Sequence, residues 1–271
     1  MRFFLAAGAV VFSAGLALGD SVLENGGAPT FTPFPVNLAT GLNSGTPYWD
    51  NYSGDFGGSN TSNIGYCLTG AGDCGLHSSI VNVNPNQYLS GTGSGGTNNA
   101  PAAFNLVHTT NSLIISVLGS FTGDPNESFG IYDASLTGAA AVASEITLFG
   151  PGVFTAGTSV NASGVPFANI GFFDKPQAGM TWFSQSSLNN SGSFTETAGH
   201  QHFALFTIAS NPNVFYLGMT DWLMGNGGEG NGDYNDIIIQ INASPEPATF
   251  MLIGAGLLGL GYTRFSGRSR K

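Results

Sequence analysis

Basic side chains are scarce in this 271-residue chain, which has six lysines and arginines against sixteen acidic residues. Lys175 is the single basic residue between positions 20 and 244, and fifteen acidic residues share that span, for a formal charge of about −14. A surface of this sign repels phosphate backbones, which argues against nucleic-acid binding. It suits cations or neutral glycans, with simple solubility as the more common reason for such a charge.

The chain also lacks the common catalytic motifs. It contains no G-x-S-x-G nucleophile elbow, no H-E-x-x-H zinc motif and no P-loop lysine. These patterns are typical of hydrolases, metalloproteases and nucleotide-binding enzymes. We therefore expect that the protein is not an enzyme. The less favoured alternative is a secreted enzyme whose active site is assembled from residues far apart in the sequence.

Residues 1–19 have the pattern of a secretory signal peptide. Arg2 precedes a mostly apolar run at 3–18, and Ala17 and Gly19 supply the small residues of a cleavage site. This pattern predicts export with cleavage after Gly19. A retained membrane anchor is the alternative, but the run is short and polar residues follow it directly.

A second apolar run, of 16 residues at 248–263, lies near the other end of the chain. A helix of this length is about 24 Å long, slightly short of the ~30 Å hydrocarbon core of a bilayer, and flanking aromatic and basic residues extend it. We expect a single transmembrane helix here, with a basic tail that stays in the cytoplasm. The tail contains Arg264, Arg268, Arg270 and Lys271.

Pro245, Glu246 and Pro247 stand directly before this run. The triplet, the Gly/Leu-rich span and the basic tail occur in that order over 244–271, and together they resemble the PEP-CTERM sorting signal of Gram-negative bacteria. The resemblance implies recognition of the triplet by an exosortase, a membrane-embedded cysteine protease-transpeptidase. It also implies release or transfer of the body to the cell surface, in bacteria that produce exopolysaccharide and form biofilms.

Between the two ends, residues 20–243 are expected to form one β-rich extracellular domain, loop-rich at 20–103 and strand-rich at 104–243. Short runs of β-branched and aromatic residues recur between turn residues. This spacing predicts an all-β fold, a β-sandwich or jelly roll, between the signal helix and the transmembrane helix. The expected strands are 113–121, 128–134, 145–150, 169–174, 180–185, 202–209, 214–223 and 236–241.

Four stretches of this domain carry more specific predictions. Residues 237–239 are all isoleucine and so apolar on both faces, which is typical of a central sandwich strand. Residues 211–213, Asn-Pro-Asn, predict a turn. A weak helix is expected at 136–146. The Gly/Ser-rich stretch 89–101 is either a linker that divides the chain or a long surface loop.

One loop near the end of the domain has the most suggestive chemistry. A strand carrying Asp221 is expected to lead into a Gly/Asn-rich loop with Glu229, which ends in Asp233, Asn235 and Asp236. Carboxylate and amide oxygens at this density, with glycines that let backbone carbonyls turn inward, suit Ca²⁺. The spacing is not that of an EF-hand. The more common role of such side chains is to form Asx-turns that end the loop.

The D-Y-N-D sequence at 233–236 also resembles the end of a domain called DUF4114, which occurs in many exported bacterial proteins. With "GHQHFALF" and "SFGIYDA" as further similar stretches, the resemblance covers roughly 125–242. It implies a β-sandwich that can bind calcium and has no established activity. The chain departs from the family in its "GNGGEGNG" loop, where an acid or arginine is common, and this leaves fewer oxygen ligands.

Cys67 and Cys74 are the only cysteines. Two cysteines that form no CxxC pair argue against a zinc site. In an exported protein they predict a disulfide that closes a small loop. Such a short loop adds little to global stability.

Two further groups are candidate binding residues. His200 and His202 would point to one face of a strand, as metal-binding pairs do, but a surface pair at the start of a strand is the more common arrangement. Tyr48, Trp49 and Tyr52 suit a platform on which sugars stack, although aromatic residues more often pack in a core.

These observations predict a structural or interaction protein of the cell surface or extracellular matrix, associated with biofilm or exopolysaccharide and sorted by an exosortase. The precursor would be anchored in the inner membrane before processing. The alternative is a glycan-binding module, stabilised by Ca²⁺, that takes exopolysaccharide as its partner. A secreted enzyme is the third possibility.

Overall fold

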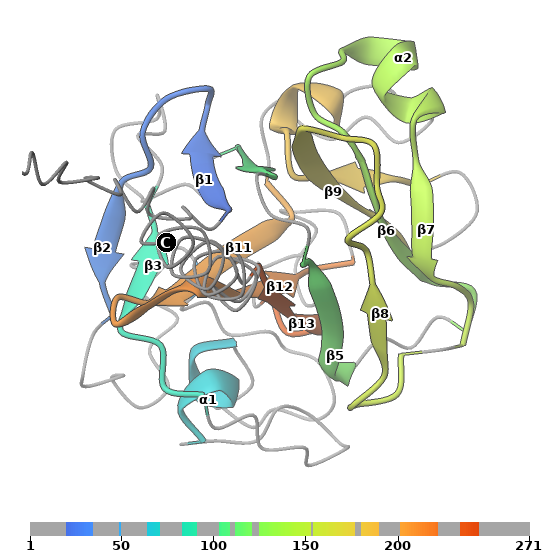
Figure 1. Cartoon of the computed structure of the whole chain (residues 1–271). Helices are drawn as coiled ribbons and strands as arrows, with labels where there is room; N and C mark the ends of the chain where they lie inside the picture. The colour runs from blue at the N-terminus through green and yellow to red at the C-terminus, as the bar shows by residue number, and fades with distance from the viewer. Residues whose placement is uncertain are drawn as a thin grey trace, which may run out of the picture.

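The protein folds as a sandwich of two antiparallel β-sheets, seen in the computed structural model in Figure 1. The structure describes residues 20–34, 49, 64–70, 83–90, 103–108, 112–120, 125–152, 154–176, 180–189, 201–221 and 234–243. This architecture confirms the all-β prediction.

Sheet A contains six strands and sheet B contains seven among the described residues. Sheet A has the order β1 (Ser21–Glu24), β4 (Phe104–Val107), β9 (Asn169–Lys175), β6 (Ser128–Asp133) and β7 (Ile146–Phe149), with β10 (Trp182–Phe183) paired to β9. Sheet B has the order β2 (Phe31–Pro33), β3 (Gln87–Leu89), β11 (Phe203–Ile208), β12 (Asn211–Met219), β13 (Ile237–Asn242), β5 (Ile114–Ser120) and β8 (Ser159–Asn161).

Short helices lie outside the sheets. Helix α1 (Ile64–Thr69) and helix α2 (Gly138–Ala143) appear at the bottom and the top of Figure 1, and a 3₁₀ turn, η1 (Ser186–Leu188), follows β10. Helix α2 falls within the helix predicted at 136–146. Among the described residues no helix is long and apolar enough to cross a membrane. The predicted signal peptide at 1–19 and transmembrane helix at 248–263 lie outside the described residues.

The loop-rich first part of the domain supplies strands to both sheets. Strand β1 pairs with β4 in sheet A, and β3 pairs with β11 in sheet B. The stretch 89–101 begins with the last residue of β3 and lies otherwise between β3 and β4, which belong to different sheets. Strands from both parts of the chain are therefore neighbours in each sheet.

The main hydrophobic core lies between the two sheets, because alternate residues of their strands point inward. On β13, Ile237 and Ile239 belong to this core, whereas Ile238 belongs to a second cluster on the opposite face of sheet B. Strand β13 lies between β12 and β5. The prediction of a central strand with two apolar faces is confirmed.

The second cluster covers the outer face of sheet B. Helix α1 contributes Ile64 and Leu68, and Trp49 packs beside Phe206 of β11. Gly218 of β12 makes room for this layer, since a Cβ there would meet Ile64. Burial on both faces explains why the central strands of sheet B lack a polar face.

Each of the eight predicted strands has a counterpart, with shifted ends. The prediction of a turn at 211–213 is wrong, because β12 begins at Asn211 and the turn lies at 209–210. Strand β12 ends at Met219, so Asp221 follows the strand and is not part of it. Strands β1 to β4 and β8 were not predicted, since runs of three or four residues show too little periodicity.

Candidate functional site

The two ends of the predicted calcium loop lie next to each other. The backbone N–H of Asp221, just after β12, donates a hydrogen bond of 2.8 Å to Oδ2 of Asp236, just before β13. Asn235 and Asp236 are both buried. Glu229 and Asp233 lie outside the described residues. The structure therefore brings together Asp221, Asn235 and Asp236, and it leaves the rest of the predicted ligand set untested.

Tyr234 anchors the end of this loop to the body. Its backbone φ is +57°, in the left-handed region that a tyrosine rarely adopts. Its ring is fully buried in the cluster outside sheet B, and its hydroxyl donates a 2.9 Å hydrogen bond to the carbonyl oxygen of Gln201. The buried ring and the hydrogen bond offset the cost of the strained backbone.

Two more carboxylates lie on the inner face of sheet A. Asp174 of β9 stands opposite Phe129 of β6 in the sheet register, and Phe129 belongs to the core between the sheets. Glu127 comes two residues before Phe129, so the alternation of the strand places it on the same face. Both acidic side chains are fully buried. Neither was singled out from the sequence.

Trp182 links the carboxylates of the two sheets. It is the register partner of Asp174 on β10. Its indole Nε1–H donates a 3.1 Å hydrogen bond to the carbonyl oxygen of Asp221. Through these contacts, Glu127 and Asp174 of sheet A come close to Asp221 and Asp236 at the end of sheet B. We call these four residues the acidic cluster.

Burial in this cluster raises the pKa of Asp174 well above its ordinary value of 3.8. The negative charges of Asp221 and Asp236 raise the pKa further. A hydrogen bond with Glu127 and one with the backbone of Lys175 act in the opposite direction but are smaller than the effect of burial. Without a compensating cation, Asp174 therefore holds a proton at a pH where an exposed aspartate is ionised.

Lys175 follows Asp174 in the sequence, but its ammonium group is engaged elsewhere. It forms an ion pair with Glu145 and lies 5.0 Å from the centre of the Phe173 ring, which packs outside the main core. Alternation along β9 places the side chains of neighbouring residues on opposite faces. The one lysine of the domain therefore does not neutralise the acidic cluster.

No group of three or more His, Cys, Asp or Glu side chains within the described part of the chain is arranged to hold a metal ion. One sequence signal was available for Asp174. It lies on the apolar strand β9, where a charged residue on an inward face is unusual.

His202 is not the surface residue that the sequence favoured. Its side chain is fully buried and its ring stacks on that of Trp182, with centroids 3.9 Å apart and an interplanar angle of 3°. Nδ1 lies 3.1 Å from the carbonyl oxygen of Thr220, so this nitrogen carries the proton and donates. His200 lies outside the described residues. His202 therefore has a packing role next to the acidic cluster.

Trp49 does not form an exposed sugar platform. Its ring is fully buried, stacks on Phe34 at 4.8 Å, and meets Tyr88 and Phe206 edge-on. A ring enclosed by three others has no free face on which a sugar could stack. Tyr48 and Tyr52, the other members of the proposed platform, lie outside the described residues.

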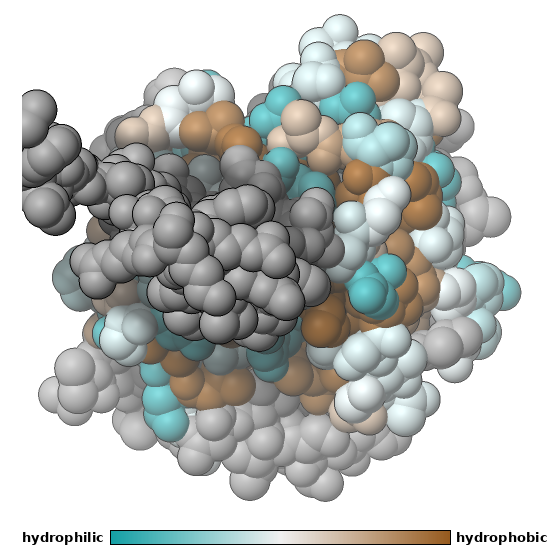
Figure 2. Space-filling model, in the orientation of Figure 1, coloured by the Kyte–Doolittle hydropathy of each residue, from teal (hydrophilic) through white to brown (hydrophobic). Residues whose placement is uncertain are grey.

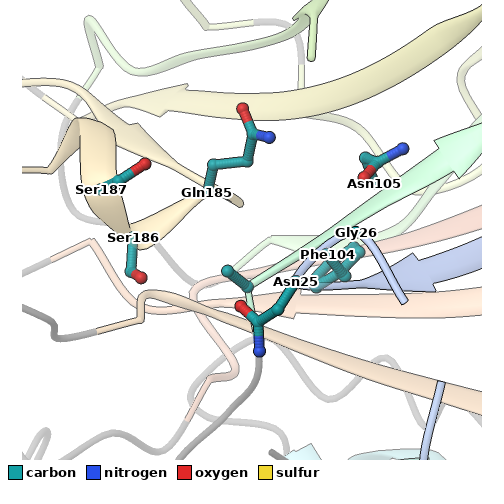
Figure 3. Close-up of a pocket in the computed structure, with 8 residues that line it drawn as sticks. Asn25, Gly26, Phe104, Asn105, Gln185, Ser186 and Ser187 are labelled. Carbon is teal, nitrogen blue, oxygen red and sulfur yellow. The ribbon is translucent and has the colours of Figure 1, made fainter. Parts of the chain in front are cut away.

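A neutral pocket of about 220 Å³ opens near the start of β4. In Figure 3 Gln185 and the serines of η1 lie on one side and the Asn25–Gly26 turn, Phe104 and Asn105 on the other. Gln185 is held by the hydroxyl of Tyr132 and by a backbone carbonyl. The pocket lining has no charged side chain.

The described surface exposes few large apolar side chains. Those exposed by a third or more are Ile114, Leu136 and Val142. Among the coloured residues of Figure 2, hydrophobic ones lie between pale and hydrophilic ones. Single exposed apolar residues are normal for a protein surface and indicate no partner by themselves.

Cys67 is fully buried in helix α1. Its predicted disulfide partner, Cys74, lies outside the described residues. The pairing of the two cysteines therefore remains a prediction. Cys67 lies in the hydrophobic cluster on the outer face of sheet B, a position that favours a small apolar side chain.

Comparison with known protein families identifies the end of the chain. Residues 245–271 match the family model of the PEP-CTERM protein-sorting motif. The chain carries a PEP-CTERM sorting signal. No curated protein and no solved structure matches the chain. The resemblance of the body to DUF4114 stays a prediction.

The PEP-CTERM signal implies that an exosortase processes the protein and that its body is extracellular. The matched residues include Pro245, Glu246 and Pro247, which resemble the recognition triplet of the family. They also include the apolar run and the four basic residues of the tail. The sorting prediction is confirmed at the level of the motif.

Proposed function

We propose that the protein is a structural or interaction component of the cell surface or extracellular matrix of a Gram-negative bacterium, delivered by an exosortase. The PEP-CTERM motif at 245–271 is the observation that carries this proposal. The body is a β-sandwich with a negative charge, an architecture that many exported binding and scaffold domains share. The chain works without catalysing a reaction.

The same proposal defines a route for the chain. The precursor is exported through the inner membrane and held there by the apolar run 248–263, with the basic tail in the cytoplasm. The exosortase then acts at Pro245, Glu246 and Pro247, and the body reaches the surface or the biofilm matrix. This route explains why four of the six basic residues of the chain follow the apolar run.

Intact mass of the exported protein tests the proposal. The chain is isolated from the native host and from a strain that lacks its exosortase. We expect a product that lacks the residues after the PEP triplet in the first strain and a chain that extends to Lys271 in the second. The same C-terminus in both strains contradicts exosortase sorting and supports a plain membrane anchor.

A second candidate function is glycan binding in the neutral pocket. Amide and hydroxyl groups of Asn25, Asn105, Gln185 and the two serines line it without a charged residue, and such groups pair with sugar hydroxyls. The pocket is smaller than most small-molecule sites, so a single sugar unit of a neutral polysaccharide is the largest occupant it suits.

Titration with exopolysaccharide purified from the host tests this second candidate. We expect binding that Asn105→Ala weakens about tenfold, which corresponds to the loss of about one hydrogen bond. Asn211→Ala is the matched control, because Asn211 is exposed on β12 and does not line the pocket. Equal binding by the wild type and Asn105→Ala contradicts the assignment to this pocket.

A further inference from the structure

The first and last strands of the described body meet the same end of the sandwich. In sheet B, the last residue of β13, Asn242, stands opposite the first residue of β5, Ile114. In sheet A, the first residue of β1, Ser21, stands opposite the last residue of β4, Val107. Strand β4 leads into β5 through the short connection 108–113, so these two places are neighbours. The chain therefore enters and leaves the body on one side.

A second connection between the sheets, 162–168, lies at the same end, because it leads from β8 to the start of β9. The N–H of His108 donates a 2.9 Å hydrogen bond to the carbonyl oxygen of Ala168. Nδ1 of the same histidine lies 2.8 Å from Oδ2 of Asp20, the residue before β1. We call this side of the sandwich the tethered end.

The chain leaves the tethered end over a short distance. Ala243 has no exposed surface, and its N–H donates a 2.8 Å hydrogen bond to the carbonyl oxygen of Asn213. The apolar run of the proposed anchor begins at Ala248, five residues later. Five residues span at most about 18 Å when fully extended, and the headgroup layer of a bilayer takes roughly 6 Å of this length. Ala243 is therefore held within about 12 Å of the membrane surface.

The body is longer than this tether. Strand β12 has nine residues. At a rise of about 3.3 Å per residue, such a strand is about 30 Å long. A body with its opposite end against the bilayer would need a tether that reaches past this whole length. The short tether therefore excludes an inverted orientation of the sandwich.

The distribution of charge favours a body that stands upright on the tethered end. Asp221 and Asp236 of the acidic cluster lie at the opposite end, where β12 ends and β13 begins. The sheet B part of the tethered end has no charged side chain among its described residues. These residues are 83–87, 112–114, 159–168, 208–213 and 241–243. A bilayer that contains anionic lipid repels acidic residues within about one Debye length, roughly 8 Å.

We propose that the uncharged tethered end of sheet B lies against the membrane surface while the precursor is anchored, with lipid headgroups as its partner. This inference rests on the proposed function, because it requires the anchor at 248–263. Ile114, one of the few large apolar side chains exposed among the described residues, lies at this end and faces the interfacial layer. The exposed turn between β11 and β12 contributes Ser210 and Pro212 to the same surface.

This orientation also determines where the neutral pocket lies. The pocket lining includes Asn25, which follows β1, and Phe104, which begins β4. Both lie at the end of the sandwich opposite the tethered end. The pocket is therefore held away from the membrane, where an extracellular polysaccharide can reach it before the exosortase has acted.

Fluorescence quenching in vesicles tests the orientation. The full chain from the strain that lacks the exosortase is reconstituted in vesicles of phosphatidylethanolamine and phosphatidylglycerol that contain a lipid with a nitroxide headgroup. A fluorophore is attached to Ser210→Cys, in the exposed turn of the tethered end, or to Ala28→Cys, in the exposed turn after β1. The chain without an added cysteine supplies the background. We expect the loss of most fluorescence at position 210 and no loss at position 28.

Two results overturn the orientation: equal quenching at the two positions, or stronger quenching at position 28. The vesicles contain no exosortase, so the outcome is independent of processing. A chain that does not float with the vesicles contradicts the anchor of the proposed function, and this orientation is then wrong as well. Flotation with equal quenching contradicts the orientation alone.

A longer tether is the matched control. A spacer of about 20 Gly and Ser residues between Ala243 and Ser244 adds roughly 25 Å of reach. The body can then turn away from the bilayer, so we expect quenching at position 210 to fall towards that at position 28. Unchanged quenching at position 210 in the spacer variant contradicts the short tether as the cause of the orientation.

Discussion

Asp221 and Asp236 are 15 residues apart in the sequence, yet the backbone N–H of the first donates a 2.8 Å hydrogen bond to Oδ2 of the second. This contact joins the end of β12 to the start of β13. Asp236 is buried, so its carboxylate is shielded from competing water. The bond closes the base of the loop that the sequence had marked as a calcium site.

Removal of the Asp236 carboxylate is expected to destabilise the sandwich. Asp236→Ala leaves the N–H of Asp221 without its acceptor, and a lost hydrogen bond to a charged group costs about 1.5–3 kcal/mol. Asp236→Asn keeps an oxygen acceptor and should cost less. Urea unfolding of both variants measures the difference. Equal stability of the alanine variant and the wild type would contradict a structural role for this bond.

The raised pKa of Asp174 predicts a specific dependence of stability on pH in the absence of divalent cations. Burial, with help from Asp221 and Asp236, makes the folded protein hold a proton that the unfolded chain releases near pH 3.8. Stability therefore falls as pH rises from 3.8 towards the raised pKa, because the folded state binds more protons there than the unfolded state. Above the raised pKa the contribution is lost.

Asp174→Asn isolates this contribution. The variant has no proton to lose at this position, so its stability in EDTA should decline less than that of the wild type between pH 5 and pH 8. The informative quantity is the difference between the two unfolding free energies at each pH, since other acids titrate in both proteins. Parallel pH curves for the two chains contradict the raised pKa.

Gly218 is predicted to tolerate no side chain. A Cβ at this position would lie 2.0 Å from Cδ1 of Ile64 and 2.4 Å from the backbone oxygen of Tyr234. Gly218→Ala should therefore lower the free energy of unfolding by about 1–3 kcal/mol, the usual cost of overpacking a core. Gly164→Ala is the control, since a Cβ there meets no atom within 4 Å. Similar losses in the two variants contradict the close approach of α1.

Trp49 is predicted to act through packing. Trp49→Ala removes a fully buried ring from three aromatic neighbours and should cost about 3–5 kcal/mol of stability. Val142→Ala, at an exposed position on α2, should change stability by less than about 0.5 kcal/mol. Denaturant unfolding measures both. A Trp49→Ala protein that keeps its stability and loses only glycan binding would support the sugar-platform hypothesis instead.

The strand pattern from residue 104 onward was predictable because burial on one face requires alternating apolar residues and burial on two faces requires a continuous apolar run. The isoleucines of β13 show it most clearly, since both faces of this strand are covered. The turn at 211–213 was predicted wrongly because Pro212 suits a turn locally, whereas pairing with β11 extends β12 through it. Tertiary contacts overrode the local preference.

The candidate site was predictable only in part. Asp221, Asn235 and Asp236 attracted notice because they lie close together in sequence on a polar loop. Glu127 and Asp174 did not, since they lie 47 positions apart and no sequence motif connects them. Only the pairing of β6 with β9 brings them to the same face of one sheet.

The sequence by itself determined how this protein is sorted, because a sorting signal is a linear order of triplet, apolar span and basic tail. It also determined the all-β class, because alternation and turn residues are local properties. The acidic cluster, the burial of Trp49 and the stacking of His202 on Trp182 depend on the tertiary structure. Each depends on contacts between residues far apart in the sequence, and the packing of the whole sandwich sets these contacts.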